Sequence, residues 1–337
     1  MRKSYLPAAL ILALLVSGCA GTQMQKKQTQ GVNFDPQRFL TAEAVGATEG
    51  EAKRDAMASL ASVFQSRVRA ETRSRANSYL TAEQGEEFEK QVQQMVLIDT
   101  DVQLEGASIG WVRPDEPAGG FRALAVLNRA RAAARWRNAL NRNQMAFSAG
   151  LQSLKTVQSR LPRLATLNRL TILMGEMAVI ESRLSVLGRP AMPSDNDFSA
   201  ILAERAVLID HIGFFIQIDG PDAGTFAQRL GALLTAQGYR LVESSHAAAG
   251  LISGKIRMQP LALENPNVRF VRALADISMI DLDTRKEMAA FSENVRKGHM
   301  DKNEAQRRAI DQLAEQTAAK LIQTLGAVGL APVNGAR

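Results

Sequence analysis

The 337-residue chain has a single cysteine, three histidines and few aromatic residues. These shortages bear on its disulfides, its metal sites and the composition of its core. One cysteine excludes a disulfide within the chain. The three histidines, His211, His246 and His299, have no partner ligand three or four residues further along the chain, so the spacing does not indicate a zinc-type cluster. Aromatic residues make up 5% of the chain, so a core of Leu, Ala, Val and Ile is expected. Stability must therefore come from aliphatic packing alone.

Several motifs of enzymes are also missing, including His-Glu-x-x-His, the Walker loop and Ser-x-x-Lys. Asp281 and Asp283 could in principle act as paired carboxylates in acid–base chemistry or hold a cation. They flank the tight turn Asp283–Lys286, however, and are better explained as turn residues. We therefore expect no enzymatic activity, no cofactor and no metal.

The start of the chain has the pattern of an export signal. Arg2 and Lys3 precede the apolar run Leu6–Val16, which is shorter than the ~20 residues that a membrane-spanning helix needs. The next residues, Val16, Ser17, Gly18 and Cys19, resemble the bacterial lipobox, in which the cysteine is acylated and becomes the mature N-terminus. The alternative is an ordinary secretory signal, but the lone thiol falls at the cleavage position. We predict a signal peptide over 1–18 and lipidation of Cys19.

The residues after Cys19 indicate where the mature protein resides. Ala20 follows the cysteine, and in the usual sorting rule Asp at this place favours the inner membrane, so the resemblance implies the outer membrane, facing the periplasm. Residues 19–38 are polar and are interpreted as a flexible tether.

The formal net charge of +7 falls by two when Arg2 and Lys3 are removed. This mild excess suits anionic lipid headgroups or cell-wall polymers and does not indicate nucleic acid.

Residues 39–128 are predicted to form a small α+β domain. A strand at 39–46 ends at Gly46, and Thr48 and Glu51 have the spacing of a capping box for a helix that reaches about Ala76. An acidic helix at 82–96 and two strands, 102–112 and 121–127, follow. The first helix carries an apolar stripe at helical spacing, formed by Ala52, Ala56, Leu60, Val63 and Val68.

The rest of the chain is predicted to contain a helical hairpin and a second α+β domain. Residues 129–188 repeat leucines at steps of three and four, which is typical of a packing seam. A linker at 189–197 leads to a domain at 198–330 in which strands at 214–218, 239–243, 251–258, 268–282 and 288–295 are combined with helices at 198–210, 226–234 and 303–325. The predicted fold class is α+β, with two small antiparallel-sheet-plus-helix domains joined by a helical hairpin.

One internal similarity links the two α+β domains. Residues 51–61 and 304–314 share Glu, Ala, Arg, Ala, Leu and Ala at equivalent positions. A duplicated module would explain the match. A helix that packs on a sheet also favours small residues at every fourth position, and this alternative stays open.

The hairpin begins with five arginines within fourteen residues. At 100° per residue, Arg131, Arg135 and Arg142 fall within about 40° of one another. Three neighbouring guanidinium groups could bind lipid phosphate or cell-wall carboxylates. A solvated helix face without a ligand is the alternative.

The lipobox, the tether and residues 46–56 together resemble the LPP-twenty family of outer-membrane lipoproteins. Its pattern continues with a tryptophan strand, here 109–112, and an alanine-leucine strand, here 121–129. The resemblance covers about residues 39–130, and this chain departs from it at Asn128, where many members have Asp. The C-terminal third resembles the small α+β modules of envelope assembly lipoproteins in architecture only.

These resemblances imply a non-enzymatic role in the cell envelope. The first hypothesis is an oligomeric scaffold of an outer-membrane assembly, such as a flagellar collar. The alternative is a periplasmic binding module that regulates a cell-wall synthesis enzyme. The expected partners are the outer membrane through the N-terminal lipid, further copies of the chain or another envelope protein, and peptidoglycan as an additional candidate.

Overall fold

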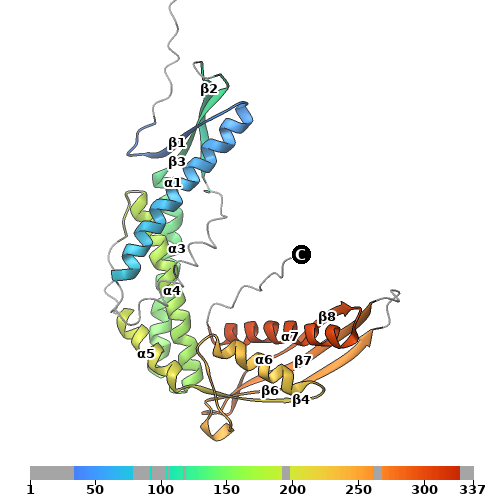
Figure 1. Ribbon diagram of the computed structural model, residues 1–337. Helices are drawn as coiled ribbons and strands as arrows, with labels where there is room; N and C mark the ends of the chain where they lie inside the picture. The colour runs from blue at the N-terminus through green and yellow to red at the C-terminus, as the bar shows by residue number, and fades with distance from the viewer. Residues whose placement is uncertain are drawn as a thin grey trace, which may run out of the picture. The chain divides into compact units, whose positions relative to one another are not determined.

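The computed structural model describes residues 34–78, 92, 104, 106–116, 119–191, 198–261 and 268–326 (Figure 1). Cys19, the lipobox and most of the predicted helix at 82–96 lie outside these residues, as does most of the predicted linker at 189–197. In this part of the chain no helix is long and apolar enough to cross a membrane. The α+β fold class is confirmed.

The first sheet has three antiparallel strands in the order β1-β3-β2, namely β1 (Phe39–Gly46), β3 (Phe121–Asn128) and β2 (Ala107–Pro114). The central strand is the most buried, with residues 123–127 all buried. Helix α1 (Glu49–Ser78) packs on this sheet. The strand predicted at 39–46 is confirmed, and both strands of the predicted hairpin are present with shifted ends.

The capping box predicted at the start of α1 is confirmed. The Thr48 amide donates to Glu51 Oε2 at 3.1 Å, and the Glu51 amide donates to Thr48 Oγ1 at 3.2 Å. One member of the predicted apolar stripe is wrong, since Val63 is 37% exposed and Phe64 is buried instead. From Leu60 the buried positions advance in steps of four, through Phe64 to Val68, so Val63 lies beside the stripe.

Residues 34–38, which the sequence placed in the tether, fold onto the first sheet. The Asp35 carbonyl accepts from the amides of Arg38 and Phe39, and the Phe34 ring meets Phe39 edge-on at 5.1 Å. A β-bulge lies at Gly110, where a Cβ atom would come within 2.6 Å of the Phe34 ring. This glycine therefore admits Phe34 to the sheet surface, which the polar composition of the tether did not indicate.

The predicted helical hairpin is formed by α3 (Arg129–Thr156) and α4 (Arg160–Val186), and α5 (Phe198–His211) packs against α4. Helix α4 is buried over most of its surface and contributes to two hydrophobic cores. Leu161 and Leu164 in its first turns belong to the core of the C-terminal sheet. From Leu167 to Leu187 its side chains belong to the core with α1, α3 and α5. One continuous helix therefore serves both cores.

The second sheet has five strands in the order β5-β4-β6-β7-β8. Its elements are β4 (Gly213–Asp219), α6 (Ala223–Thr235), β5 (Arg240–Leu241), η2 (Ser245–Ala247), β6 (Gly250–Leu261), β7 (Arg269–Asp281), β8 (Lys286–His299) and α7 (Lys302–Thr324). The sheet is mixed and not purely antiparallel as predicted, because β4 runs parallel to both β5 and β6. Helix α6 forms the crossover that parallel strands require.

Helices α6 and α7 cover the same face of the second sheet (Figure 1). On β7 the alternate residues from Val271 to Met279 face these helices and are buried. The residues between them, from Phe270 to Ile280, lie on the opposite face and are exposed or half-buried. The β-period of two thus separates a buried face from an open one.

The internal similarity between 51–61 and 304–314 falls on two helices in different topological positions. Helix α1 follows the first strand of a three-stranded sheet, whereas α7 follows the last strand of a five-stranded sheet. Three of the shared pairs are buried in both helices, namely Ala52 with Ala305, Ala56 with Ala309, and Leu60 with Leu313, whereas Ala61 is half-buried and its equivalent Ala314 is buried. Helix-on-sheet packing accounts for the match, and the topology does not support a duplication.

Replacement of Thr48 by Ala is expected to destabilise the first sheet and α1 by about 1 kcal/mol. The Glu51 amide in the first turn of α1 would lose the Thr48 hydroxyl that accepts its hydrogen bond. Urea unfolding monitored by tryptophan fluorescence tests this, since Trp111 and Trp136, in β2 and α3, are the only tryptophans. The control Ser62→Ala, at an exposed position of α1, should be neutral or slightly stabilising. Equal stability of Thr48→Ala and wild type would disprove the importance of the cap.

Candidate functional site

The arginine face predicted on α3 is exposed. Asn128 caps the helix, with its Oδ1 accepting from the Arg131 amide at 3.0 Å. Arg131, Arg135 and Arg142 all reach solvent, while the opposite side of α3 buries Ala132, Ala133 and Leu140. Arg135 also interacts within the chain. The face can therefore meet an anionic surface, and binding to one stays a prediction.

Arg129 has a different role from its neighbours on α3. Its Nε donates to the carbonyls of Pro36 at 3.0 Å and Phe39 at 3.3 Å, and its Nη1 donates to the Val186 carbonyl at 3.0 Å. Burial and the nearby Arg67 lower the pKa of Arg129. The side chain joins the N-terminal turn to the last turn of α4, where a cation also complements the helix dipole.

Asp281 and Asp283 are not an acid–base pair, because both carboxylates bind the start of α4. Ser159 Oγ donates to Asp281 Oδ2 at 2.5 Å, and Thr284 Oγ1 donates to the same oxygen at 2.5 Å. Asp283 accepts from the Arg160 amide at 3.0 Å and from the Arg160 guanidinium at 2.6 Å. The hydrogen bonds from Arg160 lower the pKa of Asp283. The two aspartates are turn residues, as predicted. Their partners Ser159 and Arg160 are more than 120 residues away in the chain, so the local sequence could not indicate them.

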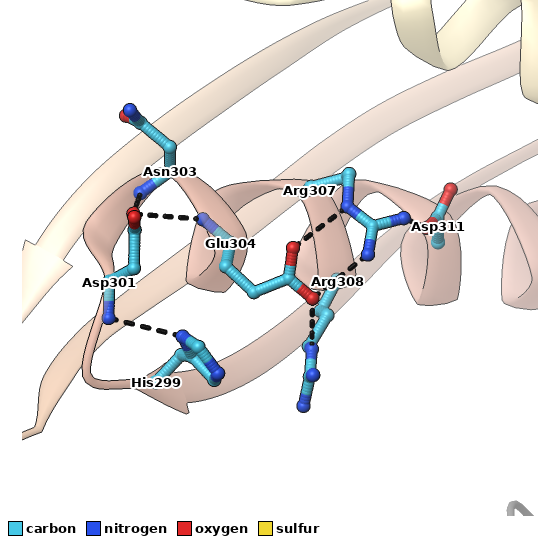
Figure 2. A network of polar contacts seen from close by, with 7 residues as sticks. All are labelled: His299, Asp301, Asn303, Glu304, Arg307, Arg308 and Asp311. Atoms are coloured by element: carbon cyan, nitrogen blue, oxygen red, sulfur yellow. Dashed lines mark hydrogen bonds and ion pairs between the residues drawn. The ribbon is translucent and has the colours of Figure 1, made fainter.

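The polar groups at the start of α7 also stabilise the fold (Figure 2). The Asp301 carboxylate accepts from the amides of Asn303 at 2.7 Å and Glu304 at 3.3 Å, and so caps the helix. Glu304 accepts from Arg307 and Arg308, which lower the pKa of Glu304 to about 2. His299 Nδ1 accepts from the Asp301 amide at 3.1 Å. Each group in this network is engaged with its neighbours.

A serine-hydrolase pattern occurs in the sequence at the start of β2. Residues 106–110 match the Gly-x-Ser-x-Gly pattern of serine hydrolases. That pattern requires the serine on a sharp turn between a strand and a helix, with a histidine within reach. Ser108 instead lies within β2, next to the bulge, and pairs with Val126 of β3. Its surroundings are those of a strand residue.

A groove of about 540 Å³ opens between α3, α4 and α5. Its charged residues include Arg163 and Glu204, which form an ion pair. Arg163 also donates to the carbonyls of Leu154 at 2.8 Å and Val157 at 3.1 Å, at the end of α3. These contacts engage Nε and Nη1 of the guanidinium within the protein. Among the residues that the structure describes, no group of three His, Cys, Asp or Glu could hold a metal ion.

Comparisons with known proteins give distant similarities only. No family model and no curated protein matches the sequence, so the resemblance to the LPP-twenty family stays a prediction. Among solved structures, a minor lipoprotein from Acinetobacter baumannii is 16% identical, with coverage of 33% of this chain and 93% of that chain and a TM-score of 0.29. A putative lipoprotein from Caulobacter crescentus is 17% identical, with coverage of 33% and 87% and a TM-score of 0.25.

A third structure covers more of the chain. The secreted protein HP1454 from Helicobacter pylori is 12% identical, with coverage of 85% of this chain and 98% of that chain and a TM-score of 0.37. At TM-scores this low the similarities establish neither a shared fold nor a shared function.

Replacement of Asp283 by Asn should destabilise the protein by about 1 kcal/mol near neutral pH, a modest loss because Arg160 is 40% exposed. The lowered pKa of Asp283 means that folding favours its ionised form, so its contribution is complete above the ordinary value of 3.8 and is lost as the pH falls through the lowered one. The difference between wild type and Asp283→Asn should therefore shrink on acidification.

Chemical denaturation followed by circular dichroism at several pH values measures this difference. The exposed Asp219 of β4 offers a control, since Asp219→Asn should change stability little at any pH. A destabilisation by Asp283→Asn that stays constant into strong acid would contradict the assigned ion pair.

Proposed function

We propose that the chain is a non-enzymatic lipoprotein of the outer membrane that is anchored through Cys19 and serves as an oligomeric scaffold of an envelope assembly. The observation that carries the proposal is the lone cysteine at the end of an export signal, in the sequence Val16-Ser17-Gly18-Cys19. An acylated N-terminus keeps the folded part close to a membrane surface. A flagellar collar is one such assembly.

The arrangement of the charged residues supports a role in binding over a role in catalysis. The carboxylates with the most hydrogen bonds, Asp281, Asp283 and Glu304, satisfy helix ends or ion pairs. The arginines predicted as a binding face on α3, Arg131, Arg135 and Arg142, are exposed, and none of them lines the groove between α3, α4 and α5. Extended charged surfaces suit contact with membranes, polymers or other proteins.

The alternative is a periplasmic module that regulates a cell-wall synthesis enzyme. Both functions use the same tether and the same exposed helix faces, and they differ in assembly. A high-order ring of the lipidated protein in light scattering or negative-stain microscopy supports the scaffold. A stable monomer that is crosslinked to a wall enzyme in intact cells supports the regulator.

Replacement of Cys19 by Ser should prevent acylation and move the protein from the membrane fraction to the soluble fraction. Mass spectrometry of the mature N-terminus should find acyl chains on Cys19 in the wild type and none in the variant. The neighbouring change Thr22→Ser serves as a control for cleavage and expression. An unacylated wild-type N-terminus would remove the basis of the proposal.

Charge reversal on α3 tests whether its arginine face contacts an anionic polymer of the envelope. Arg131→Glu with Arg142→Glu should weaken sedimentation with purified peptidoglycan by about tenfold, since each cation near an anionic surface contributes about 1 kcal/mol. The double variant Arg69→Glu with Lys155→Glu places the same charge change elsewhere on the surface. Equal binding of the two double variants would show that this face has no specific role.

A further inference from the structure

The end of the β7–β8 hairpin that lies far from its turn concentrates cations without acidic partners. We call this end of the two strands the basic end, formed by Arg272 and Arg296 on the open face of the sheet and by Arg269 and Lys297 on the face that α6 and α7 cover. Within the described part of the chain, none of the four forms an ion pair. The strand register places Arg269 opposite His299 and Arg272 opposite Arg296.

The pair Arg272 and Arg296 is unfavourable for the isolated fold. Residues directly opposite each other in antiparallel strands point to the same side, with Cβ atoms about 5 Å apart, and like charges there are destabilising. Both side chains are exposed on the open face of the sheet, away from α6 and α7. An anion held between the two guanidinium groups would remove this repulsion.

Arg296 is held in place by its neighbours. Its guanidinium lies 4.9 Å from the centroid of the Phe270 ring, a cation–π distance. Phe270 is opposite Gly298 in the register, and a Cβ atom at position 298 would meet the ring Cδ1 at 2.7 Å. The glycine therefore lets the ring lie on β8, and the ring in turn supports Arg296. Less side-chain freedom is lost when such a prearranged group binds a ligand.

An exposed apolar residue adjoins these cations. Met300, in the turn between β8 and α7, is 77% exposed and directly follows His299, which Figure 2 shows at the end of the strand. Among the described acids next to this end, Asp301 caps α7 and Glu304 pairs with Arg307 and Arg308, so neither pairs with the basic end. Cations beside an apolar tip are typical of surfaces that contact lipid headgroups and the adjoining acyl layer. A carboxylate polymer would satisfy the cations but would offer Met300 no apolar layer.

We propose that the basic end together with Met300 binds the phosphate groups of an anionic lipid surface. This inference rests on the proposed function for the presence of a membrane and adds a second contact with it, independent of the acyl chains on Cys19. The open face of the C-terminal sheet beside β8 would then turn towards headgroups. Arg272 and Arg296 bind the phosphates, and Met300 enters the interface.

The test uses the mature chain, residues 19–337, with Cys19→Ser, so that no acyl chain contributes. It is sedimented with vesicles of phosphatidylethanolamine and phosphatidylglycerol and with vesicles of phosphatidylcholine alone. We expect binding to the anionic vesicles that weakens with salt. Arg272→Glu with Arg296→Glu should reduce the affinity about tenfold or more, and Met300→Ser should reduce it to a smaller extent.

The matched control is Arg240→Glu with Lys286→Glu, which reverses two exposed charges at the opposite end of the same sheet. The milder variant Arg272→Gln covers the case in which the double reversal does not fold. It relieves the like-charge pair, so it should lower the vesicle affinity without lowering the melting temperature.

Retained binding in the control and lost binding in the basic-end variants would support the inference. Equal binding in all variants, no binding to anionic vesicles, or binding to peptidoglycan sacculi alone would overturn it. Release of the protein from anionic vesicles by inorganic phosphate, but not by chloride at the same ionic strength, would also overturn the inference. The surface would then be a site for free phosphate. If Cys19 is not acylated in cells but the vesicle results hold, the proposed function fails and the lipid-binding surface stands.

Discussion

The structure depends on one helix that belongs to two hydrophobic cores. Helix α4 places Leu161 and Leu164 against the C-terminal sheet, and its remaining turns pack with α1, α3 and α5. The first N–H groups and the last C=O groups of a helix have no partner within the helix and need other hydrogen-bond partners. Asp283 accepts from the Arg160 amide at its start, and Arg129 donates to the Val186 carbonyl at its end. Near its middle the buried Asn168 donates to the Leu325 carbonyl, which ties α4 to the end of α7.

Most of the polar side chains that could have formed a site stabilise the fold instead. Asp281, Asp283, Arg129 and Glu304 have the residue types of an active site, but their hydrogen bonds go to helix ends and ion pairs. Among the described residues, Arg272 of β7 and Arg296 of β8 form no ion pair and oppose each other in the strand register on the open face of the sheet. Since like charges in register cost stability, their presence suggests an anionic partner outside the chain.

Local signals in the sequence predicted most of the elements and the exposed face of α3. The capping box at Thr48 is a short-range pattern, and the leucine seam of the hairpin follows the helical period, so both could be read directly. The prediction was wrong for Val63, where a shift of one residue changes the side of the helix that is buried. It was also wrong for the pairing of β4, because the direction in which a strand joins a sheet is set by distant strands.

The sequence alone predicted the α+β class and the order of strands and helices, because these depend on neighbouring residues and on short periods. The export signal with its lone Cys19 is likewise a prediction from the sequence. Only the tertiary structure decided which charges are engaged and which are free. Asp283 lies 123 residues from its partner Arg160, and Arg272 meets Arg296 only through the register of two strands. The physical reason is that pairing of charges depends on distances in space, and those are set when the two cores pack around α4.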